Sequence, residues 1–149
     1  MNGFDGPVWR LLTEQLVGSP TAPATAPEGR FHHSGQIAAY ASLTAEGAEV
    51  AIKRYLTDDR KRMLVPMWLK AQAVADVRGN VAASVVWQDQ RQLGAIASTW
   101  AIADLARRAG AQALLYSSRS RPELSHVVVF DPNCLTFVGP IMPMTAVSA

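Results

Sequence analysis

The stretch GRFHHSGQIAAYASLTAEGAEVAIKRYL, residues 29 to 56, decides the fold, because a charged turn, an apolar run and a helix signal follow one another in it. Arg30 stands at its head, before a turn that ends at Gly35, and glycines permit backbone angles and close approaches that a Cβ forbids. Ile37 to Leu43 has the length and apolar character of a strand, with Tyr40 in its middle. An arginine at the mouth of a buried strand predicts a partner for its charge.

A helix is predicted directly after this strand. Thr44 can cap the first turn through its hydroxyl, and Glu46 adds a carboxylate where the helix dipole favours one. Lys53 and Arg54 fall on the side that stays in water. The positions expected on the buried face recur at helical spacing and are Ala48, Ala51, Ile52, Tyr55 and Leu56.

The composition predicts one globular domain, residues 1–149. Hydrophobic residues make up 49% of the 149 and charged residues 17%, which is enough for a single sizeable core. The balance of 14 Lys and Arg against 12 Asp and Glu gives a net charge of +2, too small to indicate nucleic acid or a membrane as the main partner. One cysteine, Cys134, rules out an internal disulfide, and the N-terminus lacks the pattern of a signal peptide. We expect a soluble, cytoplasmic protein.

N-terminal to residue 98 and outside residues 29–56, the hydrophobic pattern indicates strands and loops less clearly. Residues 8–17 fit either a short strand or a helical turn, and residues 18–29 form a proline-rich exposed loop. Residues 63–77 are apolar enough for one or two strands interrupted at Pro66. In residues 81–94, the segment VAASVVW has the composition of a buried segment, whereas QDQRQLG has that of an exposed one.

The C-terminal third predicts one helix and several strands. Ser98 can cap the helix and Gly110 can end it, with an inner face of Ile102, Leu105, Ala106 and Ala109. Strands are expected at 113–117 and 126–130, and an edge strand or packed extended segment at 135–144. Because strands and helices do not alternate regularly, the expected fold class is α+β.

Several signatures of catalytic and cofactor-binding sites are absent. The sequence has no GxGxxG after a strand, no GxxxxGK[ST], no GxSxG, no HExxH and no CxxC. The histidines His32, His33 and His126 lack the spacing of a zinc site, so no metal is expected. His32 and His33 are interpreted as part of a solvated turn.

Three segments remain that carry chemistry, and their order is informative. They are Trp9-Arg10-Leu11, then Gly29-Arg30-Phe31 with Tyr40 downstream, then Tyr116-Ser117-Ser118 ahead of the segment VVVFDP. In this order they resemble the RES-domain toxins of bacterial RES–Xre toxin–antitoxin pairs, and the resemblance covers nearly the whole chain. That family has an aromatic-Arg pair near the start, a Gly-Arg-aromatic turn, a tyrosine strand followed by a helix, and a late serine loop before a valine-rich strand.

The resemblance implies a fold like that of ADP-ribosylating toxins, with mixed sheets and a few short helices. It also implies a reaction on NAD that breaks the nicotinamide–ribose bond and passes ADP-ribose to a protein, phosphate or water. Arg10 and Arg30 would pair with the pyrophosphate, Tyr40 would stack on nicotinamide or ribose, and Ser118 would orient a ribose or amide group. Phe31, from the same turn as Arg30, joins this cofactor-binding set. The implied partner is an Xre-like antitoxin.

One residue that the resemblance requires is missing, because the position of the catalytic glutamate falls on Ala51. Glu49 is two residues away, which is ~200° of rotation on a helix, and Glu46 is five residues away, so neither replaces it. The implied catalytic set is therefore Arg30, Ser118 and position 51, with activity impaired by the alanine. The alanine was either introduced to silence a toxin that drains NAD, which we favour, or arose in a natural member that lost or relocated its carboxylate.

Two further function classes stay open. The chain can be a catalytically silent module that binds a nucleotide through Arg10 and Arg30, or binds the antitoxin. An RNA-cleaving or RNA-binding toxin is disfavoured by the low net charge and the lack of clustered basic and aromatic residues. NAD turnover by an Ala51→Glu protein, NAD protection without turnover, and salt-sensitive RNA binding distinguish the three.

Overall fold

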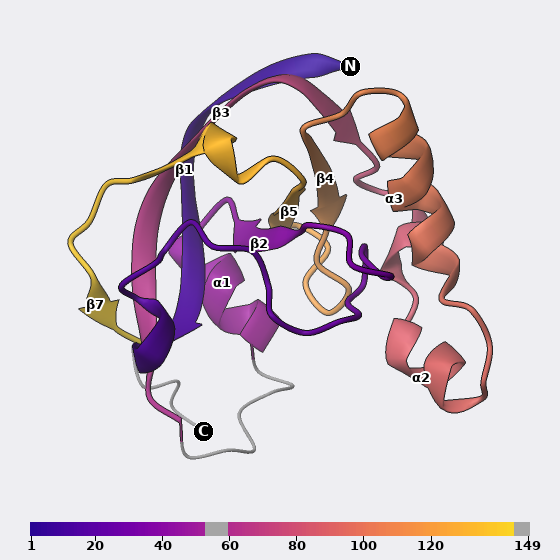
Figure 1. The fold of residues 1–149 in the computed structure, drawn as a ribbon, viewed down its shortest axis with the longest axis horizontal. Helices are drawn as coiled ribbons and strands as arrows, with labels where there is room; N and C mark the ends of the chain where they lie inside the picture. Colours follow the sequence, from indigo (N-terminus) through magenta and orange to yellow (C-terminus); the bar gives the residue numbers. More distant parts are fainter. Residues whose placement is uncertain (53–59, 145–149) are drawn as a thin grey trace.

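The computed structural model describes residues 1–52 and 60–144 and shows an α+β fold in which short helices pack against one mixed sheet (Figure 1). This confirms the expected fold class. None of the described helices has the length and hydropathy that crossing a membrane requires. The strands are β1 (Asn2–Thr13), β2 (Ala39–Ser42), β3 (Arg62–Asp76), β4 (Ala113–Ser117), β5 (Ser125–Val129), β6 (Leu135–Phe137) and β7 (Met142–Pro143). The helices are α1 (Ala45–Ile52), α2 (Trp87–Gln92) and α3 (Ser98–Arg108), with 3-10 turns η1 (Glu14–Leu16), η3 (Val81–Ser84) and η4 (Pro132–Cys134).

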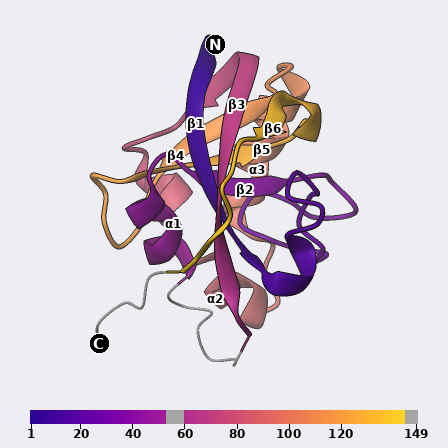
Figure 2. The ribbon, with the colours of Figure 1, turned by 90° about the vertical axis from the view of Figure 1, so that its left-hand side faces the viewer.

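Two long antiparallel strands, β1 and β3, lie side by side along their length (Figure 2). β1 settles the ambiguity of residues 8–17, which are strand as far as Thr13 and then turn into η1. The predicted interruption at Pro66 is wrong, because β3 is continuous through it. Pro66 stays in register opposite Trp9, and its carbonyl accepts the amide of Val138 at 3.2 Å. The missing N–H of proline therefore costs one donor without breaking the ladder.

The sheet closes on itself in the order β1-β2-β5-β4-β3, and β3 pairs again with β1. β3 meets β4 in parallel only at its last residues, 74–76, and β1 meets β2 at the single pair Trp9 and Ser42. Alternate residues of β5, Val127 and Val129, point into this ring and join its main core. Outside the ring, β6 and β7 pair with the free edge of β3, as predicted for the C-terminal segment.

A second core lies on the opposite face of β2, β5 and β4, where α3 and η3 pack. Val128 and Leu114 face this side, so both faces of the central strands are buried. The predicted end of α3 is confirmed. Gly110 has a φ of 89°, its amide bonds to the Arg107 carbonyl, and the Ala111 amide bonds to the Ala106 carbonyl, both at 3.0 Å, which is the Schellman pattern.

The predicted inner face of α3 is confirmed at Ala106, which is buried, and at Ile102, which packs against the second core, and it is wrong at Leu105 and Ala109. Leu105, expected inside, is 64% exposed, and the buried residues are Thr99, Trp100, Ala103 and Ala106. Ser98 is not the cap either, because its hydroxyl bonds to Gln90 and Ala97 occupies the N-cap position. The helix has this rotation because Thr99 and Trp100 bond to the backbone of the turn around Arg30.

Helix α1 follows β2 as predicted and packs against β1. Thr44 caps it, since its Oγ1 accepts the Gly47 amide at 2.9 Å. Its buried residues are Gly47 and Ala48, whereas Ala51 is exposed, contrary to the expectation that it packs inward. The expected inner positions Tyr55 and Leu56 lie outside the described residues.

Candidate functional site

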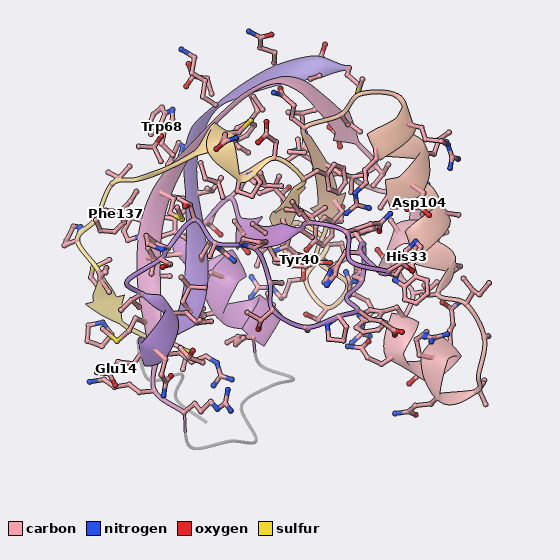
Figure 3. All side chains as sticks on the ribbon, in the orientation of Figure 1. Glu14, His33, Tyr40, Trp68, Asp104 and Phe137 are labelled. Atoms are coloured by element: carbon pink, nitrogen blue, oxygen red, sulfur yellow. The ribbon has the colours of Figure 1, made fainter. Side chains whose placement is uncertain are left out.

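A cavity of about 860 Å³ opens beside β1, β2 and the end of β4. Its described walls come from these strands, from η1 and the loop over residues 19–30, from the end of α1, and from the loop after β4, and a few positions of β3, α2 and β5 complete them. Figure 3 shows Tyr40 near the middle of the molecule, away from Trp68 and Phe137 on the far side of β3. The residues predicted for the site that line this cavity are Arg10, Arg30, Tyr40, Ala51 and Ser118.

The remaining predicted residue, Phe31, is not part of the cavity lining. It is fully buried, and its ring meets that of Tyr116 edge-on with 4.7 Å between centroids. Its amide donates to the Tyr40 hydroxyl at 3.0 Å. The structure therefore gives Phe31 a packing position behind the wall, in place of the ligand contact that was expected.

One row of residues across four strands forms part of the wall. Trp9 of β1 stands opposite Ser42 of β2, Ser42 opposite His126 of β5, and His126 opposite Tyr116 of β4. All four line the cavity. Residues in register on adjacent strands have neighbouring side chains, so the sheet itself fixes this order.

The turn that carries Arg30 is held by hydrogen bonds to several of its backbone groups. The indole nitrogen of Trp100 donates to the Gly29 carbonyl at 2.8 Å, and the Thr99 hydroxyl donates to the Arg30 carbonyl. The Gly29 amide donates to the His32 carbonyl at 3.0 Å. With its backbone tied to α3 and to its own turn, the segment presents the Arg30 side chain to the cavity from a fixed base.

Gly29 is required here by space. A Cβ at this position would lie 2.3 Å from the His32 ring and 2.7 Å from the Tyr40 hydroxyl. His32 is buried and not solvated as predicted, because its ring nitrogens bond to the Tyr40 hydroxyl at 2.7 Å and the Ala26 carbonyl at 2.8 Å. The turn, His32 and Tyr40 thus form one packed unit behind Arg30.

The Arg30 guanidinium has no hydrogen bond or ion pair with a carboxylate of the described residues. It lies 5.6 Å from the centre of the Tyr116 ring, a cation–π contact, and lines the cavity. An arginine left without a counter-ion at the wall of a cavity is available to an anionic ligand. The expectation of a partner for Arg30 is therefore not met by any described carboxylate of the chain.

Arg10 lines the same cavity, but most of its donors are in use. Its Nε donates to the Tyr40 carbonyl at 3.0 Å, and its Nη1 donates to the carbonyls of Pro20 and Ala22 at 2.7 and 2.8 Å. Burial lowers the pKa of Arg10 to about 10, which leaves the guanidinium charged at pH 7. Arg10 therefore holds the loop over the cavity and contributes positive charge, with Nη2 as the group left for a ligand.

The described lining is strongly asymmetric in charge. It contains four arginines, Arg10, Arg30, Arg62 and Arg119, and one carboxylate, Glu28. Glu28 is itself neutralised, because Arg91 grips both of its oxygens at 3.0 Å. Like charges concentrated in a cavity raise the local concentration of the opposite charge, so the site favours an anion.

The loop after β4 brings Ser118 to the cavity. Ser118 is buried, and its hydroxyl accepts the amide of Arg121 at 3.2 Å. The Arg121 guanidinium in turn bonds to Glu123 of the same loop and to Glu46 of α1, the latter at 3.1 Å. These contacts tie the serine loop to the helix that carries position 51.

Ala51 lines the cavity and is exposed, so its Cβ faces open space. Neither neighbouring carboxylate takes its place, since Glu49 does not line the cavity and Glu46 is bonded to Arg121. In the described part of the chain, no group of three His, Cys, Asp or Glu side chains could hold a metal ion.

Among the polar residues of the wall that sequence reasoning did not assign to the site are Ser42 and His126. They are 84 residues apart, and the Ser42 hydroxyl lies 2.7 Å from His126 Nδ1. Ser42 was placed within the predicted strand 37–43 and His126 at the start of the one at 126–130, and only the strand order, which a single sequence does not reveal, brings them together. Glu28 was also missed, because its partner Arg91 is distant in sequence and lies in residues 81–94, whose secondary structure the sequence did not assign.

Comparisons with known proteins extend these observations. A family model described as RES domain matches residues 7–146. Among solved structures, the chain is similar to the M. tuberculosis MbcT-MbcA toxin-antitoxin complex, with a TM-score of 0.66 and 14% sequence identity, over 97% of this chain and 86% of that chain. At this identity the likeness concerns the fold. No curated protein gives a significant match.

Proposed function

The chain belongs to the RES domain family, and from that premise we propose that it is the toxin of a toxin–antitoxin pair and acts on NAD in the cytoplasm. In the proposed reaction the bond between nicotinamide and ribose breaks, its electron pair leaves with nicotinamide, and ADP-ribose passes to a protein, phosphate or water. The similar solved structure is described as a toxin–antitoxin complex, which supports the role in such a pair. The proposed partner is an Xre-like antitoxin that covers the cavity.

The observation that carries this proposal is the position of Arg30 in a cavity lined by arginines, where no carboxylate of the described residues pairs with it. The volume of about 860 Å³ falls within the range of roughly 300–1,000 Å³ typical of ligand pockets. Arginine forks pair with pyrophosphate oxygens in a charge-assisted way. The hydroxyl of Tyr40 is bonded to Phe31 and His32, so its ring is the part that can meet a ligand.

Cleavage of the nicotinamide–ribose bond builds positive charge on the ribose, and a fixed carboxylate stabilises such a state. Position 51 would supply that carboxylate, and it holds alanine. Glu28, the carboxylate of the described lining, is held by Arg91. We infer that this chain binds NAD and turns it over poorly.

The missing carboxylate also favours a second candidate, a catalytically silent module that binds a nucleotide or the antitoxin. Both candidates use the same arginine-lined cavity. They differ in whether a glutamate at position 51 restores turnover.

Binding of ADP-ribose, measured by calorimetry, tests the occupant of the cavity. The unsubstituted protein should bind it, and Arg30→Gln should weaken binding about tenfold or more, because a charge-assisted hydrogen bond contributes roughly 1.5–3 kcal/mol. Arg78→Gln is the matched control, since Arg78 pairs with Asp76 outside the cavity and the substitution should leave binding unchanged. Equal binding by the Arg30→Gln and unsubstituted proteins would refute the proposed site.

A further inference from the structure

The buried pair Ser42 and His126 is a part of the cavity that the proposed reaction does not yet use. The two side chains are 2% and 4% exposed, and the Ser42 hydroxyl lies 2.7 Å from His126 Nδ1. They are register partners on β2 and β5, and both line the cavity. The backbone ladder and this hydrogen bond together fix the plane of the imidazole.

The other ring nitrogen, His126 Nε2, has no hydrogen bond to a described residue. The ring sits beside Tyr116, with 5.4 Å between centroids, and Tyr116 carries Arg30 over its face at 5.6 Å. An almost completely buried histidine that is held at one nitrogen and open at the other is a preorganised hydrogen-bonding group.

The imidazole is uncharged at neutral pH. Burial, and then the nearby charge of Arg30, lower the pKa of His126 to about 4. A neutral imidazole adds no charge for a phosphate, and a group that binds protons this weakly is a poor general base near pH 7. A neutral ring nitrogen at the cavity wall is suited to a neutral ligand group that can both donate and accept a hydrogen bond, such as a hydroxyl.

We propose that His126 Nε2 hydrogen-bonds a ribose hydroxyl of the bound dinucleotide, and that Ser42 is the residue that positions the ring for this contact. The inference rests on the proposed function and extends it, because it divides the wall into two subsites. The arginines take the phosphates, and the Ser42–His126 pair takes the sugar. His126 thereby acts in recognition, next to the anion site.

Two substitutions at one position separate the two nitrogens of the ring. The amide end of asparagine reaches about as far as Nδ1, so His126→Asn keeps a partner for Ser42 and loses the group at Nε2. The amide end of glutamine reaches about as far as Nε2, so His126→Gln keeps the ligand contact. The probes are ADP-ribose, which contains ribose, and inorganic pyrophosphate, which does not.

We expect His126→Asn to weaken ADP-ribose binding about tenfold, because a tenfold change corresponds to about 1.4 kcal/mol, the loss of one hydrogen bond, and His126→Gln to weaken it less than about threefold. Ser42→Ala should weaken it about fivefold by freeing the ring. None of the three should change pyrophosphate binding. NMR of the His126 ring nitrogens gives a second readout in the unsubstituted protein, where ADP-ribose should shift the Nε2 signal and pyrophosphate should not.

The outcomes are separable. Equal losses for ADP-ribose and pyrophosphate, or no loss in either His126→Asn or Ser42→Ala, overturn the ribose subsite while the proposed function stands. An Nε2 signal that ADP-ribose leaves unshifted does the same, even if the variants fail to fold. An unsubstituted protein that binds neither probe overturns the proposed function and this inference together.

Discussion

The indole nitrogen of Trp100 donates a 2.8 Å hydrogen bond to the carbonyl of Gly29, so α3 directly holds the turn that presents Arg30. The two residues are 71 positions apart. Thr99, the neighbour of Trp100, bonds to the Arg30 carbonyl, and Arg91 lies 5.0 Å over the Trp100 ring while gripping Glu28. Both sides of the turn are therefore fixed by the same helical region.

Trp100→Phe should keep the aromatic packing and remove the hydrogen bond to Gly29. Because this bond is buried and leaves a carbonyl unpaired when lost, we expect the free energy of unfolding to fall by about 1–3 kcal/mol. Chemical denaturation measures it. Trp68→Phe is the matched control, since Trp68 is 41% exposed and its indole bonds to Asp5 at the surface. Equal effects of the two substitutions would contradict a special role for Trp100.

Gly29→Ala should be strongly destabilising. Its Cβ would lie 2.3 Å from the His32 ring and 2.7 Å from the Tyr40 hydroxyl, so both side chains must move. Forcing atoms into a packed site costs about 1–3 kcal/mol. Gly18→Ala is the control, because nothing lies within 4 Å of a Cβ there. A thermal melt in which the two alanine variants unfold at the same temperature would refute this packing.

His126 should make the protein acid-sensitive. Its pKa is about 4 in the folded state against about 6.5 for an unperturbed histidine, so the unfolded state binds the proton more readily. This stabilising contribution is complete above pH 6.5 and is lost as the pH falls towards 4, by up to about 3 kcal/mol. Denaturation at several pH values measures it. His126→Phe should flatten the profile between pH 6.5 and 4, and an unchanged slope in that variant would contradict the assignment.

Arg10 should control access to the cavity through the loop that it holds. Removing its bonds to the Pro20 and Ala22 carbonyls in Arg10→Gln should free this loop. The amide of Ala24, which donates to the Ala38 carbonyl at 2.8 Å, is the reporter. We expect its hydrogen exchange to accelerate about tenfold or more. Arg78→Gln is the control and should leave the exchange rate of the Ala24 amide unchanged. An unchanged exchange rate in Arg10→Gln would contradict the claim that Arg10 holds the loop.

The sequence predicted the elements that local chemistry specifies. The Thr44 cap, the Gly110 stop and the strand at 113–117 are all confirmed, because each depends on a few adjacent residues. The α+β class followed from the irregular order of strands and helices.

What the sequence could not supply depends on contacts between distant segments. The rotation of α3 is set by Thr99 and Trp100 reaching a turn far away in sequence, which periodicity does not reveal. Pro66 sits inside β3 because β1 holds the register around it. The same limit applies to the site. The arginines could be proposed from motifs, whereas the pair Ser42 and His126 appears only once β2 and β5 are neighbours.

Nicotinamide release by the purified Ala51→Glu protein tests the central claim most directly, namely that the cavity is an NAD site lacking its carboxylate. Position 51 faces the cavity and is exposed, so a glutamate there has room to enter. We predict release at least about a hundredfold above the rate of the Ala51 protein, with Ala51→Gln at the level of the Ala51 protein. An Ala51→Glu protein that folds, binds ADP-ribose and releases no more nicotinamide than the Ala51 protein would contradict it.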